Sequence, residues 1–382
     1  MTDTPEVELV DEDELSVSPL ELFFDLVFVF AIAQIAAFVR HDLTWSGVGK
    51  GVLLVVLVYW AWSLYTWGLN ATGTSHVYVR LALLSAMGTI LLMAVALPSA
   101  FTEDGWHFAA ALVAFRLIGT GMYYLAAGEE QRAAFSSFFP LATLGAAVTL
   151  VGGFMDPSVR PWVWLGAIAV DVLATRAAER ADWHVRPAHF AERYGLLVII
   201  VLGELIVAIG VGLGDFEITT SLGVTLSIAF VVVAALWWSY FDRASGFLEE
   251  TLRTRTGIER GRFARDAYTG AHLPLVIGIA MFAVALEEVV VHPDEHIEAI
   301  AAVLLAGGIT LVIVSFLLAG YSATRQIPVE RLTGAAVIIA ITAIAWGSIS
   351  SRTLLALHAV VLVTTLIVEY RRWSHDWQRR AA

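Results

Sequence analysis

The chain has 382 residues, of which 58% are hydrophobic and 15% are charged, and its net charge at pH 7 is −12. A soluble globular domain contains about 25% charged residues, so this composition excludes that class of protein. The absence of cysteine excludes disulfides, thiolate catalysis and cysteine-based metal sites, and we expect no cofactor. The net negative charge disfavours nucleic acid as a partner.

The first 18 residues are strongly acidic, whereas a secretory signal begins with positive charge. We therefore expect a short cytosolic tail over residues 1–18 and no cleaved signal peptide. The carboxylates of this tail are Asp3, Glu6, Glu8, Asp11, Glu12, Asp13 and Glu14.

From residue 19 onward, apolar runs of about 18 residues or more recur along the chain, which is typical of an all-α, polytopic transmembrane bundle. We predict twelve spans, and most separators contain proline or other turn residues. The predicted spans are 19–39, 48–69, 77–97, 107–127, 134–154, 161–178, 189–212, 219–241, 267–287, 298–320, 331–348 and 352–370.

The positions of the arginines orient this bundle through the positive-inside rule. With a cytosolic N-terminus, 18 of the 23 basic residues fall in cytosolic loops or the C-terminal tail, 371–382. The outer loops hold Arg40, Lys50, Arg160 and Arg352, and acidic residues that include Asp215 and Glu217. We predict that both termini are cytoplasmic, that the protein lies in the cell (plasma) membrane, and that the lipid bilayer is its partner.

Short matching segments indicate an internal duplication. "WAWSLYTW" (60–67) and "LWWSYFD" (236–242) end the second and eighth spans, and "LLMAVALP" (91–98) and "AMFAVALE" (280–287) end the third and ninth. Both pairs fall at the same place in a unit of six spans. We therefore predict two parallel halves, 19–180 and 181–370, related by an axis along the membrane normal.

Ionisable residues inside the predicted spans are the best pointers to function, because a charge at mid-bilayer costs about 2.5–3.5 kcal/mol on insertion scales. Glu204 lies about 15 residues into the seventh span, Arg116 near the middle of the fourth, and Asp171 about ten residues into the sixth. Arg116 needs a carboxylate partner, which could be Asp25, Glu204 or Asp171. Asp25 is our first candidate and Glu204 the second. A purely structural ion pair, and a protonated Glu204 bound to a backbone carbonyl, are the alternatives to a role in transport.

The first and seventh spans both begin with charged residues at helical spacing. Glu21 and Asp25 are four residues apart, and His189, Glu192 and Arg193 follow an i, i+3, i+4 pattern, so each set occupies one helix face. Helix capping explains Glu21 but explains Asp25 less well. We expect these two cytosolic helix starts to meet at the junction between the halves.

Two further motifs have ordinary explanations. The outer loop "HPDEH" (292–296) offers two histidines and two acids, yet a solvated loop is far commoner than a metal site, so we expect no metal. The tryptophans at the ends of the second and eighth spans fit an aromatic belt at the membrane interface. A groove for an apolar ligand is the alternative for these tryptophans.

"PLELFFDLVFVFAI" (19–32) and "HFAERYGLLVIIVLGELIVAI" (189–209) resemble the low temperature requirement protein A (LtrA-like) family of prokaryotic membrane proteins. The resemblance places the family's acidic pattern of the first span on Glu21, Phe24 and Asp25. Its pattern in the seventh span falls on His189, Glu192, Arg193, Gly203 and Glu204. Leu205 departs from the small polar residue expected there. The family name records growth in the cold and implies an integral membrane protein, with no settled activity.

Three classes of function fit these observations. A secondary transporter of a small solute or ion, coupled to protons through Glu204 with Arg116 as its counter-charge, is our leading hypothesis. A membrane-embedded enzyme or a lipid-adaptation factor is the second, and we rank it lower because no metal-binding histidine cluster or nucleophile elbow is present. A channel lined by Glu204 and Asp25 is the third.

Overall fold

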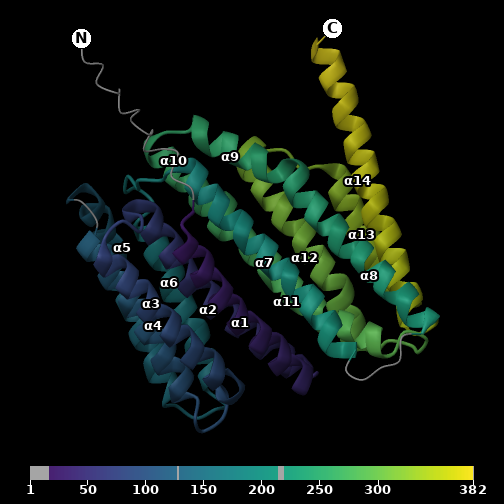
Figure 1. Cartoon of the computed structure of the whole chain (residues 1–382), viewed down its shortest axis with the longest axis horizontal. Coiled ribbons are helices and arrows are strands. Elements are labelled where there is room, and N and C mark those ends of the chain that lie inside the picture. Colours follow the sequence, from purple (N-terminus) through teal and green to yellow (C-terminus); the bar gives the residue numbers. More distant parts are fainter. Residues whose placement is uncertain (1–16, 127–128, 214–218, 382) are drawn as a thin grey trace, which may run out of the picture.

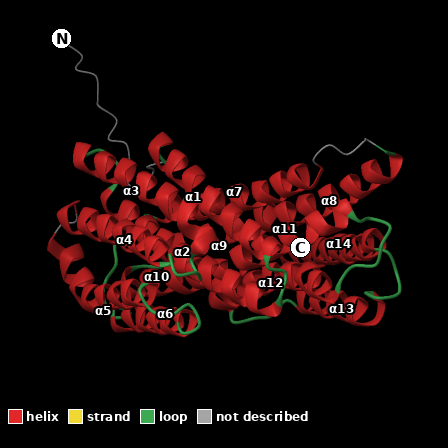
Figure 2. Cartoon of the chain, turned by 90° about the horizontal axis from the view of Figure 1, so that it is seen from below, coloured by secondary structure: helices red, strands yellow, loops and turns green. Residues whose placement is uncertain are grey.

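The structure, a computed structural model, describes residues 17–126, 129–213 and 219–381, and all regular elements in these ranges are helical (Figures 1 and 2). This agrees with the predicted all-α bundle. The acidic residues 3–14 and the carboxylates Asp215 and Glu217, which were predicted to lie in an outer loop, are outside the described residues.

Each predicted span of the first half coincides with one helix. These helices are α1 (Pro19–His41), α2 (Trp45–Thr72), α3 (Val77–Ala96), α4 (Trp106–Ala126), α5 (Glu129–Gly153) and α6 (Arg160–Ala177). A single 3-10 turn, η2 (Leu97–Ser99), follows α3.

The second half also has six long helices, together with an additional segment of shorter helices between its second and third long helices. The long helices are α7 (Pro187–Leu213), α8 (Thr220–Ser239), α11 (Ala271–Val291), α12 (Ala299–Thr324), α13 (Val329–Ala345) and α14 (Ser351–Ala381). The loop predicted between the eighth and ninth spans contains α9 (Ser245–Thr254) and α10 (Gly257–Phe263). Helix α14 continues through most of the predicted C-terminal tail.

Two π-helical turns join this inserted segment to the long helices. The turn η3 (Tyr240–Ala244) connects α8 to α9, and η4 (Ala264–Gly270) connects α10 to α11. Pro274 lies in the first turn of α11 and has no N–H to donate to the carbonyl of Gly270, which favours a wider turn at this point.

By length and composition, ten helical segments in the described part of the chain can cross a membrane. The helices α6, with 18 residues, and α13, with 17, are not among these ten. The protein is therefore a multi-pass helical membrane protein with ten candidate spans. The predicted count of twelve stays a prediction.

The helices α1, α2, α7 and α11 form the centre of the molecule, because α1 and α2 of the first half pack against α7 and α11 of the second. The helices α3–α6 lie to one side of this centre, and α8, α13 and α14 lie to the other (Figures 1 and 2). Corresponding helix pairs are neighbours in both halves: α1–α3 and α7–α11, α3–α4 and α11–α12, and α5–α6 and α13–α14. These three pairs correspond, whereas α2 packs against α4 with no comparable contact between α8 and α12, and the duplication stays a prediction.

Glycine allows the closest helix approach in the second half. A Cβ on Gly278 of α11 would lie 2.5 Å from the carbonyl oxygen of Gly308 on α12, and a Cβ on Gly308 would lie 2.6 Å from the carbonyl oxygen of Gly278. Reciprocal small residues of this kind let two membrane helices pack backbone to backbone. This contact holds α11, the central helix of the second half, firmly against α12.

Candidate functional site

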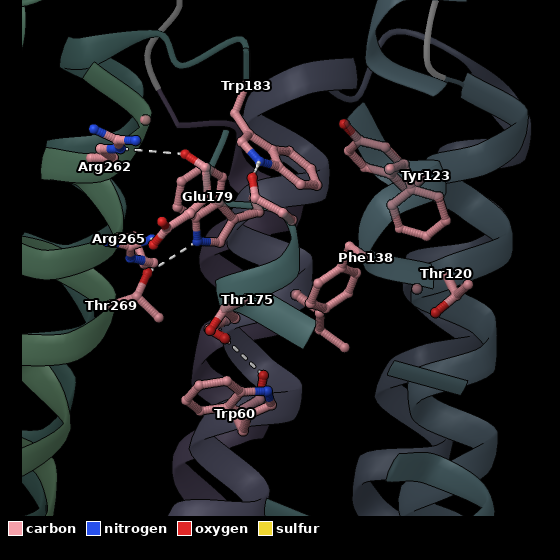
Figure 3. A pocket seen from close by; sticks show the side chains of 17 residues that line it. Trp60, Thr120, Tyr123, Phe138, Thr175, Glu179, Trp183, Arg262, Arg265 and Thr269 are labelled. Carbon is pink, nitrogen blue, oxygen red and sulfur yellow. Dashed lines mark hydrogen bonds and ion pairs between the residues drawn. The ribbon is translucent and has the colours of Figure 1, made fainter. Parts of the chain in front are cut away.

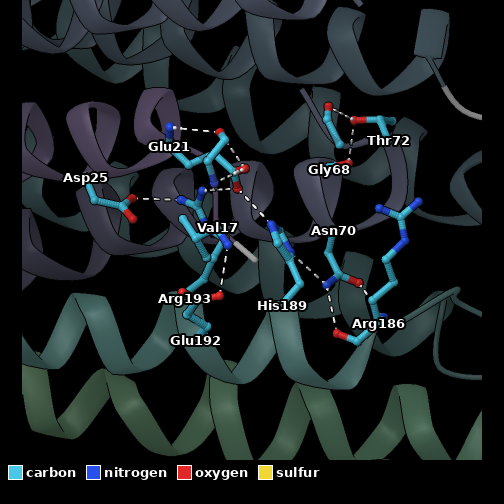
Figure 4. Close-up of polar contacts among 12 residues, drawn as sticks. Val17, Glu21, Asp25, Gly68, Asn70, Thr72, Arg186, His189, Glu192 and Arg193 are labelled. Carbon is cyan, nitrogen blue, oxygen red and sulfur yellow. Dashed lines mark hydrogen bonds and ion pairs between the residues drawn. The ribbon is translucent and has the colours of Figure 1, made fainter. Parts of the chain in front are cut away.

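The charged starts of α1 and α7 meet in the centre of the molecule, as their patterns predict (Figure 4). Both helices begin with a proline, Pro19 or Pro187, which is favoured at the first helical position. One face of α1 then presents Glu21 and Asp25, and one face of α7 presents His189 and Arg193. We call these four side chains the α1–α7 charge cluster.

Arg193 is the centre of this cluster. Its Nη1 donates to Glu21 Oε2 at 2.8 Å, and its Nη2 donates to Asp25 Oδ1 at 2.7 Å. His189 Nε2 lies 3.0 Å from the same Glu21 oxygen. No member of the cluster is more than 2% exposed. The two halves of the bundle are therefore joined by ion pairs that are shielded from solvent.

Glu21 uses both carboxylate oxygens fully. Its Oε1 accepts from the Ser18 hydroxyl at 2.9 Å and closes a capping box at the start of α1, while its Oε2 faces His189 and Arg193. The expected capping role and the ion-pair role are thus both present. A carboxylate with this many donors is held in its charged form, because hydrogen bonds and positive charge stabilise the anion.

Only one of the two carboxylate oxygens of Asp25 has hydrogen-bond partners among the described residues. Its Oδ1 accepts from Arg193 Nη2 and from the indole Nε1 of Trp62 at 2.8 Å. Its Oδ2 is buried and has no hydrogen-bond partner among the described residues, and the same holds for Nε of Arg193. The cluster therefore contains one buried acceptor, Asp25 Oδ2, and one buried donor, Arg193 Nε, that make no hydrogen bond to a described residue.

Asn70 of α2 determines the proton position on His189. The Asn70 Oδ1 accepts from the backbone N–H of Arg186, so its Nδ2 is the donor toward His189 Nδ1 at 3.1 Å. The imidazole proton then lies on Nε2 and is donated to Glu21. With a neutral His189, the cluster holds two carboxylates and one guanidinium, and negative charge exceeds positive charge by one.

Glu192 lies outside the cluster. Its side chain is exposed and its Oε2 accepts from the backbone N–H of Val17 at 2.8 Å. This bond attaches the chain that precedes α1 to α7, at the same end of the helix pair.

Arg116 pairs with Asp171, so our first candidate partner, Asp25, and our second, Glu204, were wrong. The guanidinium donates to Asp171 Oδ2 at 2.8 Å and Oδ1 at 2.6 Å, and its Nη2 also reaches the carbonyl of Ala142 at 3.0 Å. Both side chains are almost fully buried. Charges balance one to one, and α4, α5 and α6 of the first half supply all three groups.

Glu204 stands apart from both ion-paired groups. It is 5% exposed and accepts no hydrogen bond from any described residue. At 1.5 Å per residue it lies about 16 Å along α7 from Arg193. The charged side chains that act electrostatically on Glu204 are Arg40 and Glu287, and these two form an ion pair with each other at 3.1 Å.

Three polar side chains converge on Thr269 of η4, beside the charge cluster. The hydroxyl of Tyr59 donates to the Thr269 carbonyl at 2.7 Å, the hydroxyl of Tyr194 lies 2.8 Å from Thr269 Oγ1, and Trp67 Nε1 donates to the same Oγ1 at 3.0 Å. Tyr194 directly follows Arg193 in α7. Tyr194 therefore links the π-turn η4 to α7 at the position next to Arg193.

Sequence reasoning missed Asn70, Trp62 and Thr269 as members of this polar centre. Asn70 could have been predicted from the sequence, because an amide side chain at the end of an apolar span needs a hydrogen-bond partner. The interfacial belt predicted for the tryptophans at the end of the second span is wrong for Trp62, which is fully buried. Within the described residues, no group of three or more histidine, aspartate or glutamate side chains is arranged to hold a metal ion.

A sequence profile described as bacterial low temperature requirement A protein (LtrA) matches residues 16–368. The chain belongs to this family. The match confirms the resemblance seen in the first and seventh spans and includes both helices of the charge cluster. The LtrA-family chain is 29% identical over 379 residues to the Rhizobium meliloti (strain 1021) protein named Uncharacterized protein RA0937, covering 95% of this chain and 91% of that protein. That name states no activity.

Proposed function

We propose that this LtrA-family protein is a proton-coupled secondary transporter of a small solute or ion. The α1–α7 charge cluster is the observation that carries the proposal. It joins the two halves of the bundle, is buried, and contains one more carboxylate than it has positive charges. A buried group with an unmatched charge is stabilised by taking up a proton.

Asp25 is the proton site in this proposal. Glu21 has donors on both oxygens, whereas Asp25 Oδ2 has none among the described residues and can carry a hydrogen without breaking an existing bond. Protonation removes one of the two charges that hold Arg193 to α1 and weakens the contact between halves, while Glu21 remains paired with Arg193. Glu204, the proton site expected from the sequence, becomes a second titratable group toward the other end of α7.

The two helix starts support the predicted duplication. Glu21 and His189 are 168 residues apart, and Asp25 and Arg193 have the same separation. Pro19 and Pro187 precede them at matching positions. We infer that α1 and α7 are equivalent helices of two parallel six-span units, one with acids and one with bases on the shared face. Two such units that rock against each other are a known arrangement for alternating access.

We propose that the protein lies in the cell membrane with both termini in the cytoplasm, because the arginines favour that orientation. The cluster then lies within the first two turns of α1 from the cytosolic side. Six-plus-six spans include α6 and α13 as membrane helices. We propose that the protein is not an enzyme.

The experiment compares Asp25→Asn with Glu192→Gln, an exposed carboxylate near the same helix end. Purified protein in nanodiscs is titrated between pH 5 and 9, and the indole fluorescence of Trp62, which donates to Asp25, reports the cluster. A Trp62→Phe version identifies the Trp62 signal. We expect a titration in the wild type and in Glu192→Gln that is absent in Asp25→Asn.

Flux in proteoliposomes tests the coupling itself. Candidate solutes are added under an imposed pH gradient, and saturable, gradient-driven uptake that Asp25→Asn abolishes is the expected result. Large ohmic currents would establish a channel instead. Gradient-driven uptake that is unchanged in Asp25→Asn would remove Asp25 from the mechanism.

A further inference from the structure

A second group of charged side chains lies at the other end of the central helices, away from the α1–α7 charge cluster. Arg40 is the penultimate residue of α1, Glu204 lies in α7, and Glu287 lies four residues before the end of α11. These three helices pack against one another in the centre of the molecule. At 1.5 Å per residue, Arg40 lies about 22 Å along α1 from Asp25. We call these three side chains the Arg40–Glu204–Glu287 group.

The guanidinium of this group is already paired with one of the two carboxylates. Arg40 Nε lies 3.1 Å from Glu287 Oε2, and the two side chains are 24% and 18% exposed. Glu204 is more deeply buried, at 5% exposed, and makes no hydrogen bond or ion pair with any described residue. The charges of Arg40 and Glu287 both act on it. The group therefore sets two carboxylates against one guanidinium, and Glu204 is the unmatched acid.

The charged side chains around this group do not restore the balance. His41 and Glu288 also act on Glu287; His41 is exposed at the end of α1, and Glu288 is half-buried. A protonated His41 offsets only Glu288, and a neutral His41 offsets nothing. Lys50 of α2 lies over the ring of Phe101 and forms no ion pair with either carboxylate of the group. Among the described residues, negative charge therefore exceeds positive charge here by at least one.

Both ends of the contact between α1 and α7 thus carry an excess of carboxylates, with the roles of the helices exchanged. At the charge cluster, α1 supplies the acids Glu21 and Asp25, and α7 supplies Arg193. At the other end, α1 supplies Arg40 and α7 supplies the acid Glu204. An unmatched carboxylate inside a membrane protein is unfavourable in its charged form, and uptake of a proton removes that charge.

We infer that Glu204 is a second proton-binding site of this protein, controlled by Arg40 and Glu287 on the neighbouring helices. Glu204 takes the proton because Arg40 stabilises Glu287 as an anion. This inference rests on the proposed function, because it gives the same proton-coupled transporter one proton-binding carboxylate at each end of the α1–α7 contact. In the proposed orientation, Glu204 lies toward the outer side of the membrane.

Infrared spectroscopy tests the site without any substrate. A protonated carboxyl has a carbonyl stretching band that an ionised carboxylate lacks, and an exposed glutamate is ionised at pH 7 because its usual pKa is about 4.3. The protein is purified in a detergent that contains no carbonyl group. We expect Glu204→Gln to lose one carboxyl band that the wild type shows at pH 7. The control Glu298→Gln changes an exposed acid at the same end of the bundle and should keep that band.

Changes at the two neighbours distinguish a controlled site from an acid that is merely buried. Glu287→Gln leaves Glu204 as the single carboxylate of the group, so that Glu204 pairs with Arg40, becomes ionised and loses its band although it is itself unchanged. Arg40→Gln leaves the group without a cation, so that Glu287 also takes up a proton and a second band appears at pH 7. An unchanged spectrum in both variants would overturn the inference, because Glu204 would then be neutral through burial alone.

The variant Asp25→Asn separates this inference from the proposed function. We expect two carboxyl bands in the wild type, one lost in Asp25→Asn and the other in Glu204→Gln. A band that only Asp25→Asn removes would overturn the inference and keep the proton site at Asp25. A band that only Glu204→Gln removes would keep the inference and exclude Asp25 as a proton site. A Glu204 band that sodium chloride removes and choline chloride does not would show that a metal cation displaces the proton, and this result would also overturn the inference.

Discussion

Two buried ion groups in the same bundle differ in charge balance and in position. Arg116 and Asp171 belong to one half, and a single guanidinium meets a single carboxylate through two hydrogen bonds. The α1–α7 charge cluster joins both halves and sets two carboxylates against one guanidinium. A balanced pair inside one half has no unmatched charge for a proton to neutralise. An unbalanced cluster between two bodies changes its free energy when a proton binds or when the bodies move.

The largest effect is expected from breaking the balanced pair. Asp171→Asn leaves Arg116 buried and uncompensated, and loss of one partner of a buried pair typically costs about 3–5 kcal/mol of unfolding free energy. The double variant Arg116→Gln with Asp171→Asn removes the stranded charge and should recover much of that loss. Denaturant unfolding of the four proteins in detergent measures this cycle. Additive single and double effects would show that the two side chains do not act as a pair.

Asn70 determines the tautomer of His189 in the α1–α7 charge cluster. Asn70→Leu keeps the side-chain size but leaves the backbone groups of Arg186 and the Nδ1 of His189 without the amide, which we expect to cost about 1–3 kcal/mol. It also removes the amide donor that fixes the imidazole tautomer of His189. Nitrogen NMR of labelled histidine detects that change as altered Nδ1 and Nε2 shifts of His189 relative to wild type. A His189 spectrum identical in both proteins would disprove the tautomer assignment.

Asp25→Asn should be far milder than the matching change at Asp171. Arg193 keeps Glu21 as a charged partner, so no charge is stranded, and we expect a loss of about 1 kcal/mol from the weakened hydrogen bond. Unfolding of Asp25→Asn and Asp171→Asn under the same conditions compares the two groups directly. A loss of similar size in both variants would mean that the cluster contains no spare carboxylate.

Much of the fold and half of the site follow from local pattern. Apolar runs and their separators place the long helices, because a membrane span has a fixed length and burial requirement. The i, i+4 spacing of Glu21 with Asp25 and of His189 with Arg193 places each pair on one face. The meeting of α1 and α7 agrees with the expectation that the two charged helix starts adjoin at the junction between the halves.

The partner of Arg116 could not be predicted in the same way. Asp25, Asp171 and Glu204 are all buried carboxylates in spans, and the choice among them depends on which helix faces turn toward each other. Packing of small residues decides this: a Cβ on Gly145 of α5 would lie 2.4 Å from Asp171 Oδ1, so glycine there makes room for the carboxylate.

Trp60 and Trp67, for which an apolar groove was the alternative to an interfacial belt, do line a pocket between α2, α4, α5, α6 and the α10–η4 segment (Figure 3). The sequence could not predict its other walls, because they come from separate segments.

The smallest effect is expected at Glu192, the one carboxylate of the predicted charged pattern that lies outside the buried cluster. Its side chain is exposed and accepts one hydrogen bond from the Val17 backbone. Glutamine keeps an acceptor oxygen at this position, so Glu192→Gln should change the unfolding free energy by less than about 1 kcal/mol and leave the pH titration of Trp62 in place. Glu21→Gln is the matched comparison on α1, because it removes a carboxylate that meets both Arg193 and His189. We expect Glu21→Gln to destabilise the protein more strongly and to leave Asp25 as the single charged partner of Arg193, which balances the cluster and abolishes proton uptake near neutral pH. Denaturant unfolding and the fluorescence titration of both variants check this, and equal behaviour of the two would show that burial between α1 and α7 has no bearing on how these carboxylates act.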